Sequence, residues 1–342
     1  MVTIEDVAKE CGVSPMTISR VVNGSNLVKE ATRKKVLEVI QKTGYRPNMI
    51  ARGLVKGRSK TIGILFSNYY NQAYTDILFS IEEVAYNNGY NVINANVDDY
   101  YHAVNSLDLF LGNKVDGIIV LPLEMNILNV TDYKQAMVET QKFLEYFYDT
   151  IKRQEVFAIT VSQNIGDIFN IAFNFTEQAQ KTMDFLFKKG YKDIAMLNSN
   201  LNDGFWLDKE RVYFQSMKER GYEKYICIER DIGLMEGGNR AMEKLLTKKI
   251  PQAVYCGNDY IAIGALQTIN KHKLTIPNDI AVIGNDNVYF CEMTAPKLTT
   301  VSLNAKLAGK VAMEHMLKLL NGEKLDGSEY VVETELVIRE SL

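Results

Sequence analysis

The chain has 342 residues, of which 46% are hydrophobic and 24% are charged, and its formal net charge is −3. This length and composition exclude a disordered or fibrous chain and predict a small module together with one large or two medium domains. The four cysteines lack the spacing of a disulfide framework or a zinc site, and no apolar run resembles a signal peptide or a membrane span, so we expect a cytoplasmic protein without metal or membrane partner.

Charge is distributed unevenly along the chain. Residues 1–60 hold 12 basic and 5 acidic residues, a net charge of +7, whereas the remaining 282 residues hold 27 basic and 37 acidic residues, a net charge of −10. A basic segment on an acidic body favours a polyanion as the partner of that segment alone. A basic run can also be a solvated face, so the local helix pattern has to decide between the two interpretations.

The N-terminal segment predicts three short helices. Thr3 caps the first, with Asp6 in position to close a capping box, and Gly12 permits a tight turn. In "VSPMTISRVVNG", Ser14 suits the N-cap and Pro15 the first position of a second helix. Two short helices backed by a third are typical of a helix-turn-helix, whose second helix enters the DNA major groove, although an ordinary three-helix packing unit has the same pattern. The third run, 29–45, should point Val36, Leu37, Val39 and Ile40 inward, and the second helix leaves Pro15, Met16, Thr17, Ser19, Arg20 and Asn23 free to face a partner.

Past residue 60, short β-rich runs alternate with amphipathic helices. This alternation predicts parallel sheets with helices on both faces and two α/β lobes, whose ligands would lie beyond the carboxyl ends of the strands. The segment 124–155 predicts a long amphipathic helix, either a long crossover helix or a modified dimer or effector contact. The expected strands are 61–66, 90–96, 115–122, 156–161, 193–198, 225–229, 253–258 and 279–284, and the inward side chains of the long helix are Met137, Phe143, Leu144, Phe147 and Ile151.

These motifs resemble one family along essentially the whole chain. The N-terminal "TIEDVAKECGVSPMTISRVVNG" and "ATRKKVLEVIQKTGYRPNMIARGL" look like the head of the LacI/GalR (lactose-repressor) family of bacterial transcription regulators. The similarity continues through "KTIGIL", "VDGIIVLP", "GNDYIAIGAL", "IPNDIAVIGNDN" and "APKLTTV".

The resemblance implies an all-α helix-turn-helix head and an α/β core of the periplasmic-binding-protein type, with two doubly wound parallel-sheet lobes between which the chain crosses three times. The head would cover 1–46, a hinge helix and linker 47–60, and the effector-binding and dimerisation core 61–342. The first lobe would hold about 61–160 and 291–322, and the second about 161–290 and 323–342.

The resemblance also implies the DNA contacts. Arg20 would read a guanine by a bidentate contact, whereas Pro15 and Met16 would make apolar contacts. Leu54 holds the position of the family's minor-groove wedge, and Gly53 beside it is a departure that should make the hinge helix easy to melt. The full expected set is Thr3, Ser14, Pro15, Met16, Thr17, Ser19, Arg20, Asn23, Tyr45, Ala51 and Leu54.

For the effector, the resemblance implies that Arg211 and Asp259 hold the ligand, a forked cation and an acceptor that suit a polyol or a carboxylate. Asn285 and Asn287 depart from the family pattern, as does the segment "SNYYNQAYTD". For Tyr70 and Trp206, plain packing is an equally good interpretation. The full expected set is Tyr70, Tyr74, Trp206, Arg211, Asp259 and Asp286.

An enzyme is disfavoured, because the three histidines have no acidic or cysteine partner at a useful spacing and the chain has neither a P-loop nor a GxSxG motif. No cofactor is therefore expected. We predict a DNA-binding repressor of carbohydrate-uptake or catabolic genes, a homodimer that binds a pseudo-palindromic operator and answers to a sugar or sugar acid. A purine co-repressor, or a phosphorylated protein partner in place of a small molecule, remains an alternative.

Overall fold

A computed structural model describes residues 2–22, 24–45, 58–67, 71–123, 125, 133–201 and 204–342. The chain forms two compact units, Met1–Lys60 and Thr61–Leu342. The predictions for Asn23, Ala51, Leu54 and Tyr70 lie outside the described residues. Within the described part of the chain, no helix is both long and apolar enough to cross a membrane.

The first unit contains the three expected helices, α1 (Ile4–Cys11), α2 (Pro15–Val22) and α3 (Glu30–Thr43). One small core joins them, because each helix turns its apolar stripe toward the other two. Leu37 was expected in this core but is 51% exposed, since it lies about 100° around α3 from buried Val36 and nearly opposite to Val39. The fully or nearly fully buried members are Val7, Ala8, Cys11, Ile18, Val21 and Val36.

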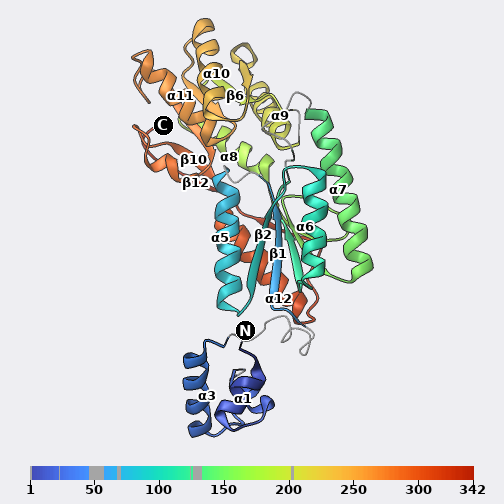
Figure 1. Ribbon diagram of the computed structural model, residues 1–342. Helices are drawn as coiled ribbons and strands as arrows, with labels where there is room; N and C mark the ends of the chain where they lie inside the picture. The colour runs from blue at the N-terminus through green and yellow to red at the C-terminus, as the bar shows by residue number, and fades with distance from the viewer. Residues whose placement is uncertain are drawn as a thin grey trace. The chain divides into compact units, whose positions relative to one another are not determined.

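The second unit holds two six-stranded sheets with helices on both faces (Figure 1). The strand order is β11-β5-β4-β3-β1-β2 in the first and β12-β10-β9-β8-β6-β7 in the second, and of the strand pairs only β10–β12 is antiparallel in the described residues. The first sheet contains β1 (Thr61–Phe66), β2 (Asn91–Asn96), β3 (Gly117–Val120), β4 (Phe157–Val161), β5 (Phe169–Phe173) and β11 (Glu329–Val332). The second contains β6 (Ile194–Ser199), β7 (Ile228–Asp231), β8 (Ala253–Cys256), β9 (Ala281–Asp286), β10 (Thr299–Ser302) and β12 (Glu335–Val337).

Alternate residues of each strand feed two cores, one on each face of each sheet. On the first sheet, α5 (Gln72–Asn87) and α12 (Ala305–Leu320) cover one face, and α6 (Tyr100–Gly112) and α7 (Tyr133–Gln154) cover the other (Figure 1). On the second sheet, α8 (Phe175–Lys188) and α9 (Gly204–Glu219) cover one face, and α10 (Met235–Lys248) and α11 (Asp259–Lys271) the other. Two short 3-10 turns, η2 (Glu223–Tyr225) and η3 (Tyr289–Glu292), complete the second lobe.

The sheets correct the expected lobe boundaries. Strand β11, in the final segment that was expected to complete the second lobe, pairs with β5 in the first sheet. Strand β5, in a segment expected in the second lobe, pairs with β4 in the first sheet, and β10, expected in the first lobe, pairs with β9 in the second. β5 and β10 follow β4 and β9 without an intervening α-helix, and the boundaries expected from the resemblance fell before each of them. The chain crosses between sheets after β5, after β10 and between β11 and β12, which gives the three crossings that were expected.

Helix α7 occupies the described part of the unusual 124–155 segment. Its side chains Phe143, Leu144, Phe147 and Ile151 are buried against the first sheet as predicted. Met137 was expected to face inward but is 48% exposed, because it lies in the N-terminal part of the helix, before the buried stripe begins at Phe143.

Candidate functional site

Helix α1 is capped at both of its ends. The Thr3 hydroxyl accepts from the Asp6 backbone N–H at 3.2 Å, and the Asp6 carboxylate accepts from the Thr3 N–H at 2.9 Å, which confirms the capping box. The bonds that the Thr3 N–H and the Thr3 hydroxyl donate to the Asp6 carboxylate lower the pKa of this carboxyl. Gly12 ends α1 with a φ of 68°, a left-handed conformation that glycine adopts without strain.

Helix α2 carries an exposed front above a buried back. Ile18 and Val21 are buried, whereas Pro15, Met16 and Arg20 are exposed, Met16 by 62%. The Ser14 hydroxyl accepts from the Thr17 N–H at 3.3 Å and lies 3.0 Å from the Thr17 hydroxyl, so this N-cap steadies the start of the helix.

The other described residues that were expected on this surface of α2 and beside it are less exposed. Thr17 and Ser19 are half-buried on α2. Tyr45 packs beside the small core, and burial raises the pKa of its hydroxyl. The structure therefore places one forked cation, Arg20, among exposed apolar and hydroxyl side chains, which are the groups that read base edges and position phosphates.

In the second unit, Asp259 opens α11 and is completely buried. One carboxylate oxygen accepts from the Thr300 hydroxyl at 2.6 Å, and the other accepts from the Val288 N–H at 2.9 Å. Burial raises the pKa of this carboxyl, against the effect of these two bonds. Through these two bonds Asp259 ties α11 to β10 and to the loop after β9, and its contact with a ligand stays a prediction.

Asp286, the last residue of β9, lies in a strained turn. Its φ is 110° and that of Asn287 is 61°. Residues other than glycine adopt a positive φ uncommonly. Burial raises the pKa of the Asp286 carboxyl, and the Lys209 ammonium acts in the opposite direction. The Asn287 side chain accepts from the Arg339 guanidinium at 2.8 Å, which fixes the turn.

Arg211 does not lie where the sequence predicted. Its side chain is 67% exposed and pairs with Asp208 at 2.7 Å, and it faces a surface hollow beside Phe214 and Arg230. The cation that α9 turns inward is Lys209, which is 1% exposed and donates to the Gly257 carbonyl at 2.6 Å.

Three rings surround Lys209, and we call them the aromatic cluster: Phe175, Phe205 and Trp206. The ammonium lies 5.6 Å, 5.7 Å and 5.7 Å from their centroids in that order, close enough for cation–π attraction. Gly257 has to be a glycine here, because a Cβ would overlap both the Trp206 ring and the Asn198 side chain. Trp206 is 5% exposed. Tyr74, which was also expected at the effector, packs beside the core of the first lobe.

Comparison with known proteins identifies the family. Residues 3–48 match the bacterial regulatory proteins of the lacI family, and residues 183–342 match a periplasmic binding protein-like domain. The chain is 32% identical to the HTH-type transcriptional regulator RegA of Clostridium saccharobutylicum over 348 residues, covering 99% of this chain and 98% of that protein. The chain belongs to the lacI family.

Two further similarities agree with this. Catabolite control protein A of Priestia megaterium is 32% identical over 349 residues, covering 99% of each chain. The crystal structure of the lac repressor dimer bound to operator and the anti-inducer ONPF has the same fold, with a TM-score of 0.80 at 24% identity over 99% of this chain and 98% of that one. The prediction of a DNA-binding transcriptional regulator is thereby confirmed, and so is the prediction of a helix-turn-helix head with a two-lobed α/β core.

In this lacI-family chain, helical spacing carried the signal for Lys209 that the motif comparison missed. Positions three or four apart share a helix face, so Lys209 shares a face with Trp206, and Tyr213 follows on the same face. Arg211 lies five residues after Trp206 and turns away from that face. Choosing the arginine because its type matched the family therefore selected the wrong side of α9.

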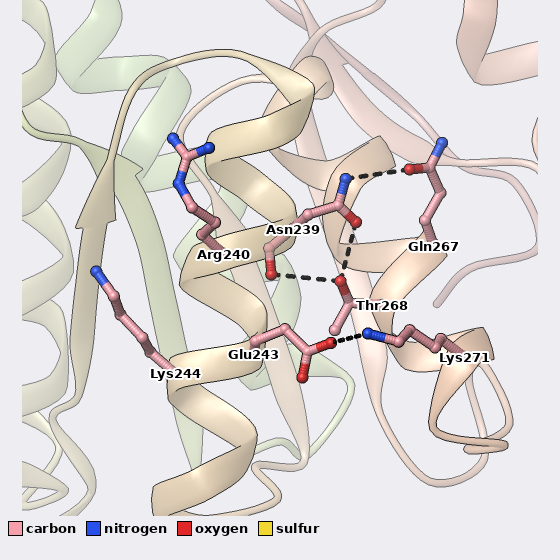
Figure 2. A pocket seen from close by; sticks show the side chains of 7 residues that line it. All are labelled: Asn239, Arg240, Glu243, Lys244, Gln267, Thr268 and Lys271. Carbon is pink, nitrogen blue, oxygen red and sulfur yellow. Dashed lines mark hydrogen bonds and ion pairs between the residues drawn. The ribbon is translucent and has the colours of Figure 1, made fainter.

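A separate surface pocket of about 580 Å³ lies between α10 and α11 (Figure 2). Five of its seven lining side chains bond to one another: Asn239 donates to Gln267 at 3.2 Å, Thr268 donates to Asn239 at 2.9 Å, and Lys271 pairs with Glu243 at 2.8 Å (Figure 2). None of the residues expected to bind effector lines this pocket, so it does not belong to the candidate effector site.

Proposed function

We propose that this regulator is a cytoplasmic homodimeric repressor of carbohydrate-uptake or catabolic genes, controlled by a small hydroxyl-rich effector, a sugar or sugar acid. The observation that carries the effector proposal is the position of Lys209 among the three rings of the aromatic cluster, where its charge also acts on the Asp286 carboxyl at the end of β9. The name of the relative catabolite control protein A supports the choice of target genes.

Lys209 and Asp286 offer complementary chemistry to such a ligand. An ammonium donates to hydroxyl or carboxylate oxygens, and a carboxylate accepts from hydroxyls. Asp286 ends β9, Gly257 follows β8, and ligands of doubly wound folds lie beyond the carboxyl ends of the strands. The rings of the aromatic cluster present flat apolar faces that suit the C–H face of a sugar ring. In this proposal Lys209 takes the role that the sequence assigned to Arg211, and Asp259 acts as support.

On DNA, Arg20 reads a guanine and Met16 contacts a thymine methyl, while Ser14 and Thr17 position the backbone. Arg20 is exposed and Met16 is 62% exposed on the same short helix, which supports this assignment. Leu54 enters the minor groove as a wedge, as the family resemblance implies.

A second copy of the chain covers two exposed apolar surfaces. On α5, Phe79 and Tyr86 are 64% and 82% exposed, and their spacing of seven residues places them on one face. At η3, Tyr289 is 61% exposed, and Met293 just beyond it is 65% exposed. Apolar groups of this size outside a core favour a protein partner, and an operator with two half-sites requires two heads.

Screening the full chain by thermal shift tests the effector proposal. Sugars, sugar acids and nucleobases are compared, and calorimetry on Lys209→Met and on Arg211→Met follows for any compound that stabilises the protein. We expect the first variant to lose affinity and the second to keep it. Stabilisation by a nucleobase alone would support the purine alternative, and binding only of a phosphorylated protein would overturn the small-molecule effector.

A further inference from the structure

One residue of the first lobe bonds to two separate segments of the second. Gln72 is the first residue of α5, after the N-cap Asn71, whose side chain accepts from the Ala73 N–H at 3.0 Å. The Gln72 N–H donates to the Tyr260 hydroxyl at 3.4 Å, and its side-chain oxygen accepts from the Tyr289 N–H at 3.3 Å. The first N–H groups of a helix lack partners within the helix, so the end of α5 is suited to hold another element.

The two segments that Gln72 contacts are attached to the candidate effector site. Tyr260 follows Asp259 in the first turn of α11, and Tyr289 comes three residues after Asp286. The loop between Asp286 and Tyr289 is fixed to Asp259 by the bond from the Val288 N–H. The two segments are therefore bonded to each other, and a displacement of Asp286 would also move Tyr260 and Tyr289, the two residues that Gln72 contacts.

A different kind of connection joins the lobes at the crossover after β5. Phe173 of β5 packs beside the first-lobe core and lies 6.0 Å from Phe175, ring centroid to centroid. Phe175 lies 5.1 Å from Phe205, which lies 4.6 Å from Trp206 in the second lobe. The chain itself is continuous at this crossover, so it can act as a pivot, whereas the bonds of Gln72 join segments far apart along the chain and would break if the lobes separated.

We infer that Gln72 is a positioning residue that fastens the first lobe to the segments after Asp259 and Asp286, and through which ligand binding at Asp286 biases the arrangement of the lobes. The second clause rests on the proposed effector site. The fastening itself requires neither effector nor DNA, so it can be tested on the free protein.

The test compares Gln72→Ala with Gln141→Ala in the full chain. Gln72 also bonds to the Asp76 carboxyl four residues on, and Gln141 of α7 donates to Glu145, likewise four residues on, at 3.1 Å. The control variant therefore loses the same kind of bond within a helix of the same lobe but no contact between lobes. Tyr260→Phe removes the hydroxyl that accepts from the Gln72 N–H and keeps the ring.

Two readouts report on the contact directly. Hydrogen exchange of a peptide containing the Tyr289 amide should be about two- to tenfold faster in Gln72→Ala, the effect of losing one neutral hydrogen bond. Trp206 is the only tryptophan, and its quenching by acrylamide should increase if the lobes separate around it. Tyr260→Phe should increase quenching as well, and the double variant should add less than the sum of the two.

Equal exchange and equal quenching in Gln72→Ala and Gln141→Ala would overturn the fastening role. Changed exchange together with unaltered effector affinity, once an effector is known, would retain the fastening and overturn the coupling. Failure to find any small-molecule effector would count against the proposed function but would leave the first two measurements valid.

Discussion

Replacing Lys209 by Met should destabilise the second unit far more than replacing Arg211 by Met. The variant leaves the Gly257 carbonyl without its donor at 2.6 Å and removes the positive charge that lowers the pKa of the Asp286 carboxyl. A hydrogen bond to a charged group contributes about 1.5–3 kcal/mol, and leaving a buried acceptor unsatisfied costs about 1–3 kcal/mol. The uncharged Met side chain has no such desolvation cost as the buried ammonium, which offsets part of this loss. We therefore expect the free energy of unfolding to fall by about 2–3 kcal/mol.

The matched control is Arg211→Met on the same helix. The Arg211 side chain is 67% exposed, so its ion pair with Asp208 should contribute only about 0.2–1 kcal/mol to the free energy of unfolding. Urea unfolding of both variants, followed by the fluorescence of Trp206, gives the two free energies of unfolding. Equal losses in the two variants would refute the assignment of Lys209 as the inward cation.

The pH dependence gives a second check on the same variant. Burial raises the folded-state pKa of Asp286 above its ordinary value of about 4, so ionisation of this carboxyl reduces stability as the pH rises through that window. Without Lys209 the folded pKa rises further, and the reduction becomes larger. The loss of stability in Lys209→Met should therefore be larger above about pH 7, the folded-state pKa of Asp286 in the unsubstituted protein, and smaller and constant below it, where this carboxyl is protonated in both folded proteins.

Four other outcomes are expected. Arg20→Ala should weaken binding to a selected operator by about 1–3 kcal/mol and relax preference at one base pair per half-site, measured by competition with scrambled DNA; an unchanged ratio would contradict the base contact. Leu54→Ala should weaken operator binding without lowering the thermal stability of the core, and full operator affinity would indicate a mere tether. Gly284→Ala should cost about 1–3 kcal/mol in urea unfolding, because its Cβ would overlap the buried carboxylate that ties α11 to β10, whereas Gly112→Ala meets open space and should cost nothing. Phe79→Ser should shift the dimer toward monomer in sedimentation analysis, and an unaltered dimer would place the interface elsewhere.

Local interactions explain why the sequence predicted the head so well. A capping box involves Thr3 and Asp6 only three residues apart, and the turn at Gly12 depends on that residue's own backbone, so both could be read from neighbours. Most strands of the second unit were equally legible, because apolar runs bounded by turns predict buried parallel strands. The same logic failed for Leu37 and Met137, since an apolar residue faces the core only if another element lies opposite to it.

The sequence by itself determined the fold class and the family, because both rest on local patterns and on motifs that keep their spacing. Only the tertiary structure decided which sheet receives β5 and β10, since a strand joins the sheet whose free edge it can reach, whatever its own composition. It also decided that Lys209 turns inward and Arg211 outward, and that Asp259 is satisfied by Thr300 and Val288. The bonds of Lys209 and Asp259 join residues that are 29 to 48 positions apart along the chain, so they form only after the strands and helices have packed.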